Sequence, residues 1–318
     1  MNAQPLVSIV ILNWNGEKLF PACIESLYNI DYSPIEIVFV DNGSTDNSLE
    51  IARGFKNIAI IENGKNLGYA AGNNRAINRI TGKYVCFLNN DIVVDRAWLN
   101  EAVRYLETYK TVGVIACRNM DYFNKEIIDG LYHHVIPFFT LWRFGRGKAF
   151  CNDPLYSTPG YVLSALGSSA IYRTDLIKKL EGFDESFFAY WEDVDLCMRI
   201  NNAGYRCLYD PSAVVYHMDQ ASFGKNSKKS AYYSDRNKFF FIKKNFPFSF
   251  LKTIGNDVFL DDLRAIKCSL AGDKDLWLFL KARFDSLLRL KNYRYSLKPD
   301  AFKLEYIKEL ILKIKLPL

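Results

Sequence analysis

The first third of the chain alternates short apolar runs with segments of helical spacing, and this alternation restricts the folds that the chain can adopt. The apolar runs are rich in Val and Ile and are predicted as buried strands, at Val7–Leu12, Ile35–Val40, Ile58–Ile61, Tyr84–Leu88 and Val112–Ala116. The segments between them space their apolar residues as helices do, at Glu17–Tyr28, Asn47–Arg53, Ala70–Ile80 and Ala97–Tyr109. Repeated strand–helix units predict an α/β fold with a mostly parallel, Rossmann-like sheet and helices on both faces.

Polar residues directly follow these predicted strands. They are Asn13–Gly16, Asp41–Asp46, Asn63–Gly72 and Asn89–Asp91. Parallel strands end at one edge of a sheet, and ligands bind at that edge. We therefore expect the four segments to form one cleft.

An acidic segment in an apolar surround marks a second candidate region. Phe187–Arg199 reads FFAYWEDVDLCMR and places Glu192, Asp193 and Asp195 at the predicted start of a helix. A carboxylate near apolar groups is costly unless it is paired or used. A second acidic feature, FLNND at Phe87–Asp91, ends a predicted strand. One carboxylate cluster that takes a proton and one that holds a metal would suit group transfer from a nucleotide-activated donor.

Each candidate at the strand ends also has a purely structural interpretation. Asp41 could accept the N3–H of a uracil or thymine base, but DNGSTDNS reads equally as a turn and a helix cap. In NLGYAAGNN, Asn66 and Gly68 would let a ligand approach the backbone before a helix, although the string is neither a dinucleotide-binding motif nor a P-loop. Asp91 could be the carboxylate of a magnesium site with Asn90 as a neutral ligand, or both could belong to an Asn-rich turn.

The acidic segment leaves comparable alternatives. Glu192 and Asp193 are adjacent, so on a helix only one of them would face the cleft while the other positions it or holds the acceptor. Asp195 and Arg199 are spaced as helical surface ion pairs usually are.

The histidines carry less information. His217 follows an apolar run and could be either structural or a metal ligand at a strand end. We assign no role to His133 and His134, which lie in an aromatic segment. No arrangement of Ser or Cys with His indicates a covalent nucleophile.

Charge is unevenly distributed along the chain. From Arg236 onward there are 18 Lys and Arg against 9 Asp and Glu, whereas the preceding residues carry 23 against 26. Leu276–Leu290 and Phe302–Leu316 are apolar on one side and basic on the other. This tail is either a helical subdomain packed on the body or a surface for peripheral contact with an anionic membrane. We expect no nucleic-acid partner.

The cysteines and the N-terminal residues indicate the cellular compartment of the protein. The seven cysteines are scattered and include no CxxC pair, which favours free thiols in a reducing cytosol. The N-terminus lacks the basic region of a secretory signal, and no apolar stretch reaches the length of about 18 residues that spans a bilayer. We expect a cytoplasmic protein that touches the inner face of the cell membrane at most peripherally.

With these residues in hand, the order of motifs resembles glycosyltransferase family 2, which has the GT-A fold. The matching strings run from VSIVILNWNG through DNGSTD, NLGYAAGNN, FLNND, GSSAIYR and GFDESFFAYWEDVDLCMRINNAG to VVYH, over about Val7–His217. Each string alone is weak, but their shared order is specific. The later YYSDRNKFFFIKKNF, at Tyr232–Phe246, is similar to the branch containing rhamnosyltransferases of surface polysaccharide assembly.

The resemblance implies inverting transfer of a sugar from a nucleoside diphosphate sugar, of the UDP or dTDP type. It places the nucleoside near Leu12, Asn13 and Asn15 and the nucleobase at Asp41. Asn66, Gly68 and Asn90 would complete the donor-binding residues. The implied acceptor is a hydroxyl of a growing surface glycan or of a polyprenyl-diphosphate-linked glycan.

The resemblance also assigns catalytic roles. Asp193 aligns with the general base and Glu192 with its acidic neighbour. Asp91 aligns with the metal-binding motif and implies a divalent cation, Mg²⁺ or Mn²⁺. The motif here reads Asn-Asn-Asp and has one carboxylate, so His217 is expected to compensate as a further ligand.

The expected organisation is a GT-A domain at 1–235 and a basic helical extension at 236–318. Within the first, 1–120 would bind the nucleotide sugar and 121–235 would bind the acceptor and supply the base. A sugar nucleotidyltransferase is a rival interpretation, but it predicts a Gly-rich basic loop after the first strand, where this chain has NWNGEK. A non-catalytic nucleotide- or glycan-binding module is the second rival.

Overall fold

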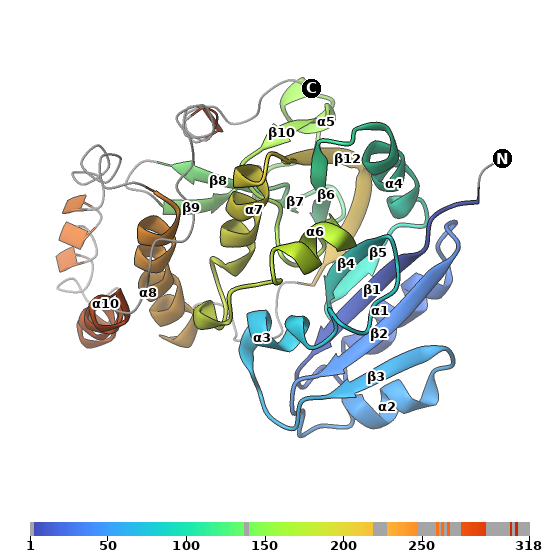
Figure 1. Cartoon of the computed structure of the whole chain (residues 1–318), viewed down its shortest axis with the longest axis horizontal. Helices are drawn as coiled ribbons and strands as arrows, with labels where there is room; N and C mark the ends of the chain where they lie inside the picture. The colour runs from blue at the N-terminus through green and yellow to red at the C-terminus, as the bar shows by residue number, and fades with distance from the viewer. Residues whose placement is uncertain are drawn as a thin grey trace.

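The computed structural model describes residues 3–136, 140–218, 228–246, 259–260, 262–263, 266–267, 275–290, 306 and 309–310 (Figure 1). The strands are β1 Val7–Asn13, β2 Ile35–Asp41, β3 Ile58–Glu62, β4 Tyr84–Asn89, β5 Ile92–Val94, β6 Val112–Asp121, β7 Ile128–Gly130, β8 His133–Ile136, β9 Thr140–Arg143, β10 Gly160–Val162, β11 Ile171–Arg173 and β12 Arg206–His217. The helices are α1 Phe20–Tyr28, α2 Ser48–Gly54, α3 Gly68–Asn74, α4 Trp98–Thr108, α5 Pro154–Ser157, α6 Thr174–Lys179, the 3₁₀ turn η2 Glu185–Phe187, α7 Glu192–Asn202, α8 Lys228–Asn245 and α10 Leu276–Leu290.

One large sheet forms the centre of the molecule, in the order β10-β12-β6-β11-β4-β1-β2-β3. Strands β4, β1, β2 and β3 are parallel, as strand–helix alternation requires. Strand β11 runs antiparallel between β4 and β6, and β12 then pairs parallel with β6. The β4–β1–β2–β3 side therefore follows directly from the sequence pattern, while β11 and β12 add a second, mixed side.

Helices cover both faces of this sheet, and each face has its own core. Apolar residues of α1, α2 and α4 pack on one face with β1, β2 and β4 residues such as Ile9 and Phe39. Residues of α3, α6 and α7 pack on the other with Val10 and Phe87. Strand residues are buried on both faces, which explains why β1 and β4 read as continuous apolar runs rather than alternating ones.

Most predicted elements are confirmed within about three residues, and two differ more. Strand β6 continues to Asp121, beyond the predicted end at Ala116. The predicted helix Ala70–Ile80 is the shorter α3, which ends at Asn74 and continues as turns. The apolar segment 164–173 contains the short strand β11. Strand β7, the β8–β9 hairpin and α5 lie between β6 and β10.

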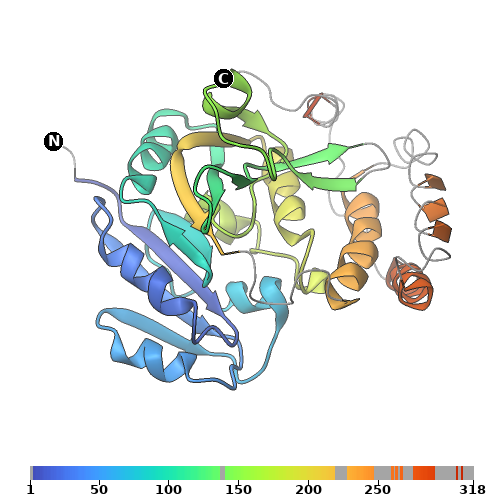
Figure 2. The same cartoon turned by 180° about the vertical axis from the view of Figure 1, so that it is seen from behind.

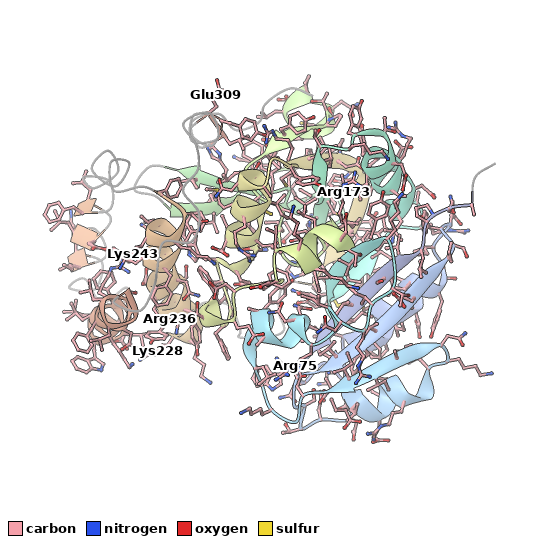
Figure 3. All side chains as sticks on the ribbon, in the orientation of Figure 1. Arg75, Arg173, Lys228, Arg236, Lys243 and Glu309 are labelled. Carbon is pink, nitrogen blue, oxygen red and sulfur yellow. The ribbon has the colours of Figure 1, made fainter. Side chains whose placement is uncertain are left out.

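The C-terminal part packs on the body through α8. This helix contacts α7 on one side and α10 on the other, and both views show the three helices in that order (Figures 1 and 2). The expected boundary between 235 and 236 falls inside α8, where Lys228, Arg236 and Lys243 lie along one helix (Figure 3). The predicted helix Phe302–Leu316 lies almost wholly outside the described residues. No helix within the described residues has the length and apolarity needed to cross a bilayer.

Candidate active site

Polar strand ends meet at one edge of the sheet, as expected. The Asn90 amide donates to Asn13 Oδ1 at 2.7 Å, which joins the ends of β4 and β1. The amide of Asn13 donates to Ser48 Oγ at 2.8 Å, which ties β1 to the segment after β2. The Asn42 amide donates to Asn66 Oδ1 at 3.2 Å and connects that segment to the loop before α3. These bonds fix the relative positions of the four polar segments.

A cavity of about 250 Å³ opens beside these strand ends. Seven of the predicted site residues line it: Leu12, Asn66, Gly68, Asn90, Glu192, Asp193 and His217. Two others contact lining residues, Asn13 through Asn90 and Asp91 through His217. Asn15 and Asp41 contact the Ser44 turn, which does not line the cavity. The fold therefore brings the strand-end polar residues and the acidic segment, which are distant in sequence, to one cavity.

Asp193, at the start of α7, is held by three donors. Its Oδ2 accepts from His133 Nε2 and from the Gly167 main-chain N–H, both at 2.9 Å, and its Oδ1 accepts from the Val194 N–H at 2.8 Å. Burial acts to raise the pKa of Asp193, but His133 and the two main-chain donors outweigh it and leave the pKa below the ordinary value. A Cβ at Gly167 would lie 3.2 Å from Asp193 Oδ2, so glycine permits this close main-chain approach. Asp193 is an ionised carboxylate fixed at the cavity wall.

The neighbouring carboxyl group has the opposite character. Glu192 is 6% exposed, and its Oε2 is buried without a hydrogen-bond partner. Burial first, and the Asp193 charge second, raise the pKa of Glu192 well above its ordinary value. The two adjacent carboxyls thus have opposite pKa shifts, which favour the charge on Asp193 and the proton on Glu192.

A second carboxylate site lies where β4 and β12 end. Asp91 Oδ1 is buried and has no hydrogen-bond partner, although His217 Nε2 lies 3.4 Å away. The other ring nitrogen, Nδ1, lies 2.8 Å from Asp129 Oδ2, which also accepts from Arg143 at 2.7 Å. Burial opposes a charge on His217, but Asp91 and Asp129 outweigh it and raise the pKa of His217 to about 10.

Asp91 and His217 supply donor types that suit a divalent cation, and the His217 imidazole would release its Nε2 proton on binding, because a ligating nitrogen must be neutral. An unpartnered carboxylate oxygen faces an imidazole nitrogen, and Asp129 holds the other imidazole nitrogen as outer carboxylates do at metal sites. Within the described residues, no three His, Cys, Asp or Glu side chains gather as a metal site built from protein alone would need. Further ligands would have to come from a bound molecule, as is common for Mg²⁺.

Several site residues were not predicted from the sequence. His133 and Arg143, from the β8–β9 hairpin, line the cavity and contact Asp193 and Asp129 respectively. The His133 N–H donates to the Ser164 carbonyl at 3.0 Å, and this pairing brings the hairpin to the cavity. No local pattern signals these contacts, because each joins residues far apart in sequence.

Asp41 forms the turn that was one of its two interpretations, and one predicted ion pair differs. The Asp41 carboxylate accepts from the N–H groups of Gly43 and Ser44 at 3.1 Å, so it shapes the turn after β2. The expected surface ion pair between Asp195 and Arg199 is wrong, since Asp195 is fully buried and Arg199 is 7% exposed. Helix α8 covers this pair and adds a second cation, as described below.

Solved structures of other proteins share this architecture. The fold resembles that of a mannosyltransferase from Pyrobaculum calidifontis in complex with GDP-Man and Mn²⁺, with a TM-score of 0.58, 18% identity, and coverage of 98% of this chain and 82% of that one. S. aureus TarS 1–349 in complex with UDP-GlcNAc gives a TM-score of 0.59 at 18% identity, over 96% of this chain and 83% of that one. The fold is the GT-A fold of glycosyltransferases, with C-terminal helices.

The family follows from the sequence. The model of the family described as "Glycosyl transferase family 2" matches residues 8–179, and the chain belongs to this family. The protein is a glycosyltransferase.

Two of the relatives of this chain are rhamnosyltransferases. Rhamnosyltransferase WbbL of Escherichia coli is 27% identical over 232 residues, 69% of this chain and 86% of that protein. The N-acetylglucosaminyl-diphospho-decaprenol L-rhamnosyltransferase of Mycobacterium tuberculosis is 26% identical over 219 residues, 61% of this chain and 69% of that protein. A further relative, the uncharacterized protein y4gI of Sinorhizobium fredii, is 26% identical over 238 residues, and the match covers 70% of this chain but only 26% of that protein.

Proposed function

We propose that the protein transfers a sugar, with inversion and with a divalent cation, from a nucleoside diphosphate sugar to a hydroxyl group of a polyprenyl-diphosphate-linked or growing surface glycan. L-Rhamnose from a dTDP-sugar is the donor that we favour, because two relatives are named rhamnosyltransferases, with a UDP-sugar as the alternative. The polyprenyl acceptor is supported by the name of the mycobacterial relative. The observation that carries the proposal is an ionised Asp193 fixed in the same cavity as His217 and the strand-end donors.

In this mechanism Asp193 is the general base. The acceptor oxygen bonds to the anomeric carbon, the bond from that carbon to the diphosphate oxygen breaks, and the hydroxyl proton passes to Asp193. The raised pKa of Glu192 favours its protonated form, in which it can donate a hydrogen bond to a sugar or acceptor oxygen.

Donor binding is assigned to the strand-end residues. Leu12, Asn13 and Asn15 on β1, with Asp41 and its turn, would surround the nucleoside, and Asn66, Gly68 and Asn90 would line the diphosphate and sugar. Asp91 and His217 would hold a divalent cation, which neutralises charge on the departing diphosphate. Arg143, which lines the cavity, adds a positive charge beside the same anion.

A donor panel tests the reaction. UDP-, dTDP- and GDP-sugars would be supplied with Mg²⁺ or Mn²⁺ and a polyprenyl-linked glycan, with released nucleoside diphosphate measured and the anomeric configuration of the product read by NMR. We expect inversion, and loss of transfer in Asp193→Asn and in Asp91→Asn. Asp153→Asn is a matched control, because Asp153 caps α5 outside the cavity. Retention of configuration, or full transfer by Asp193→Asn, would refute the mechanism.

Cation binding can be measured separately from sugar transfer. Mn²⁺ binding followed by electron paramagnetic resonance in the presence of nucleoside diphosphate should weaken in Asp91→Asn and in His217→Phe, whatever the activity. Equal Mn²⁺ affinity in wild type and Asp91→Asn would remove the cation from the proposal. If the protein binds nucleotide but turns over no donor, the result would instead support the rival interpretation, a non-catalytic nucleotide- or glycan-binding module.

Membrane contact is assigned to α10. Trp277, Leu280, Phe284, Leu287 and Leu288 form an exposed apolar stripe on this helix, where Trp277 is 77% and Phe284 59% exposed. The opposite face, with Phe279 and Ala282, is buried. An apolar stripe on a helix of the basic tail matches an anionic phospholipid surface, which is where a polyprenyl acceptor resides. On this proposal the protein acts at the inner face of the cell membrane.

Vesicle sedimentation tests this surface. The double variant Trp277→Ser/Phe284→Ser should bind phosphatidylglycerol vesicles at least about tenfold more weakly than wild type, because each exposed aromatic side chain contributes about 1.5–3 kcal/mol when buried. Phe123→Ser is the control, since Phe123 is 68% exposed outside the C-terminal helices. Equal vesicle binding by wild type and the double variant would rule out α10 as the contact.

A further inference from the structure

The loop that precedes the two cavity carboxyls has a strained backbone. Phe188, Tyr190 and Trp191 all have positive φ, at 65°, 70° and 75°. This region is unfavourable for side chains with a Cβ, and bulky residues rarely adopt it. Around Phe188 the Ala189 N–H donates to the Phe187 carbonyl at 2.8 Å, which closes a γ-turn of the rare, strained kind. Such a loop keeps its shape only where its surroundings hold it.

Helix α8 holds the main-chain oxygens of this loop. The Asn237 amide nitrogen lies 2.7–2.8 Å from the carbonyl oxygens of Phe187, Ala189 and Tyr190, and its two N–H groups are shared among these three acceptors. The Arg236 guanidinium donates to the carbonyls of Ser186 and Phe187 at 3.1 and 2.9 Å, and to Asn237 Oδ1 at 2.9 Å. Asn237 is fully buried and Arg236 is 4% exposed, so these bonds are shielded from water.

The same helix packs on the aromatic rings of the loop. The ring pairs are Phe187 with Phe240, Phe188 with Tyr233 and Trp191 with Phe241, at centroid distances of 6.3, 4.8 and 5.0 Å. On its other side the loop meets α3, where the Tyr69 N–H donates to the Phe188 carbonyl at 2.6 Å. The loop is therefore fixed between the cavity wall at α3 and the helix α8.

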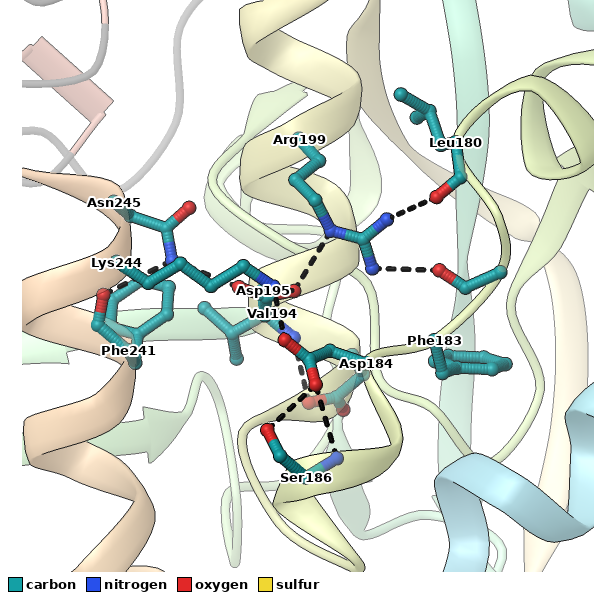
Figure 4. A network of polar contacts seen from close by, with 12 residues as sticks. Leu180, Phe183, Asp184, Ser186, Val194, Asp195, Arg199, Phe241, Lys244 and Asn245 are labelled. Carbon is teal, nitrogen blue, oxygen red and sulfur yellow. Dashed lines mark hydrogen bonds and ion pairs between the residues drawn. The ribbon is translucent and has the colours of Figure 1, made fainter. Parts of the chain in front are cut away.

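A buried ionic network joins α8 to the first turns of α7 (Figure 4). Lys244 Nζ donates to Asp184 at 2.6 Å and to Asp195 at 2.9 Å, and the Asn245 amide donates to Asp195 at 3.0 Å. Arg199 also donates to Asp195, at 2.9 Å. Asp195 lies two residues beyond Asp193, so α8 holds the chain on both sides of that carboxylate.

We propose that Arg236 and Asn237 are positioning residues, which hold the strained loop so that α7 begins with Asp193 directed into the cavity. The proposal rests on the proposed function only for the role of Asp193 as the base. It explains the motif YYSDRNKFFFIKKNF, because Tyr233, Arg236, Asn237 and the α8 aromatic residues belong to it. Without these contacts the loop relaxes toward unstrained backbone angles, and the carboxylate moves from its place beside the acceptor.

The test compares Asn237→Ala and Arg236→Lys with Asn201→Ala in the full chain. Asn201 is an equally buried asparagine near the end of α7, and its amide donates to the Cys197 carbonyl within that helix. Hydrogen exchange of residues 186–196, kcat for sugar transfer and donor affinity by calorimetry would be measured for each variant. Arg236→Lys keeps the positive charge but loses the planar guanidinium with its several N–H donors. It serves as the milder variant should Asn237→Ala fold poorly.

We expect faster exchange in residues 186–196 and a kcat lowered by about 100-fold in Asn237→Ala, since a small displacement of a catalytic group costs about that much. Donor affinity should stay unchanged, and Asn201→Ala should keep the wild-type kcat and loop exchange. Unaltered loop exchange in Asn237→Ala and Arg236→Lys would overturn the proposal, as would a kcat loss of the same size in Asn201→Ala. A wild-type protein that transfers no sugar would refute the proposed function instead, and loop exchange alone would then decide the role of α8.

Discussion

Replacing His133 should move the acid limit of the reaction. His133 Nε2 lies 2.9 Å from Asp193 Oδ2 and helps to hold the pKa of Asp193 below its ordinary value, against the effect of burial. A hydrogen bond to a charged group contributes about 1.5–3 kcal/mol. One pKa unit corresponds to about 1.4 kcal/mol, so His133→Phe should raise the pKa of Asp193 by about 1–2 units.

The sign follows from the role proposed for Asp193 as the base. Asp193 must be ionised to take a proton, so activity is lost as the pH falls through its pKa. A higher pKa therefore moves the acid limb of kcat/KM for sugar transfer to higher pH by the same 1–2 units, roughly. His133→Gln should restore most of the wild-type profile, because its amide nitrogen can still donate to Asp193.

The assay is kcat/KM for transfer as a function of pH, in wild type, both His133 variants and His134→Phe. His134 is the adjacent histidine of the same hairpin strand and does not line the cavity, so its variant should keep the wild-type profile. An acid limb that stays in place in His133→Phe, or that moves equally in His134→Phe, would refute this account of the base.

Three further predictions concern stability, each measured by urea unfolding. Lys244→Met removes a cation from the buried network of Figure 4 and should cost about 3–5 kcal/mol, whereas Lys281→Met, at an exposed ion pair, should cost less than about 1 kcal/mol. Gly68→Ala should cost more than about 1 kcal/mol, because φ is 83° there and a Cβ would lie 2.5 Å from the Phe188 carbonyl oxygen; no loss of stability would contradict this. Hydrogen bonds from Ser8, Thr81 and Gly82 outweigh burial and lower the pKa of Glu36 in the fold, so its contribution is present above the unfolded pKa and is lost as the pH falls through the folded pKa. Glu36→Gln should therefore destabilise by about 1 kcal/mol at pH 7 and by much less in acid; an equal loss at both pH values would be inconsistent with this.

Sequence patterns predict those parts of the molecule that depend on local spacing. The strands β1 to β4 were predictable because each is a buried run of Val and Ile that ends in polar residues. Their convergence followed from the geometry of parallel strands. Glu192 and Asp193 stood out because carboxylates in an apolar surround need an explanation.

The environment of those carboxyl groups could not be predicted from local sequence patterns. The contact between His133 and Asp193 joins residues 60 positions apart, and the contact between Asn237 and Phe187 joins residues 50 apart. The spacing of Asp195 and Arg199 is typical of surface ion pairs. It carries no information about which other element of the fold covers the pair. Lys244, from α8, buries that pair, and only the folded chain shows this.

The docking of α8 also bears on the order in which the protein acquires activity during synthesis. Strands β1 to β4 leave the ribosome early and can begin to pair, since chains fold from the N-terminus as they emerge. Strands β11 and β12, which complete the sheet, follow much later, and α8 emerges after both. Until α8 has emerged, the loop at Phe188–Trp191 lacks the contacts that hold its backbone. If the proposed function holds, a nascent chain can therefore present the strand ends assigned to the donor well before the Asp193 carboxylate is set, and competence to transfer sugar requires that α8 has packed on the body.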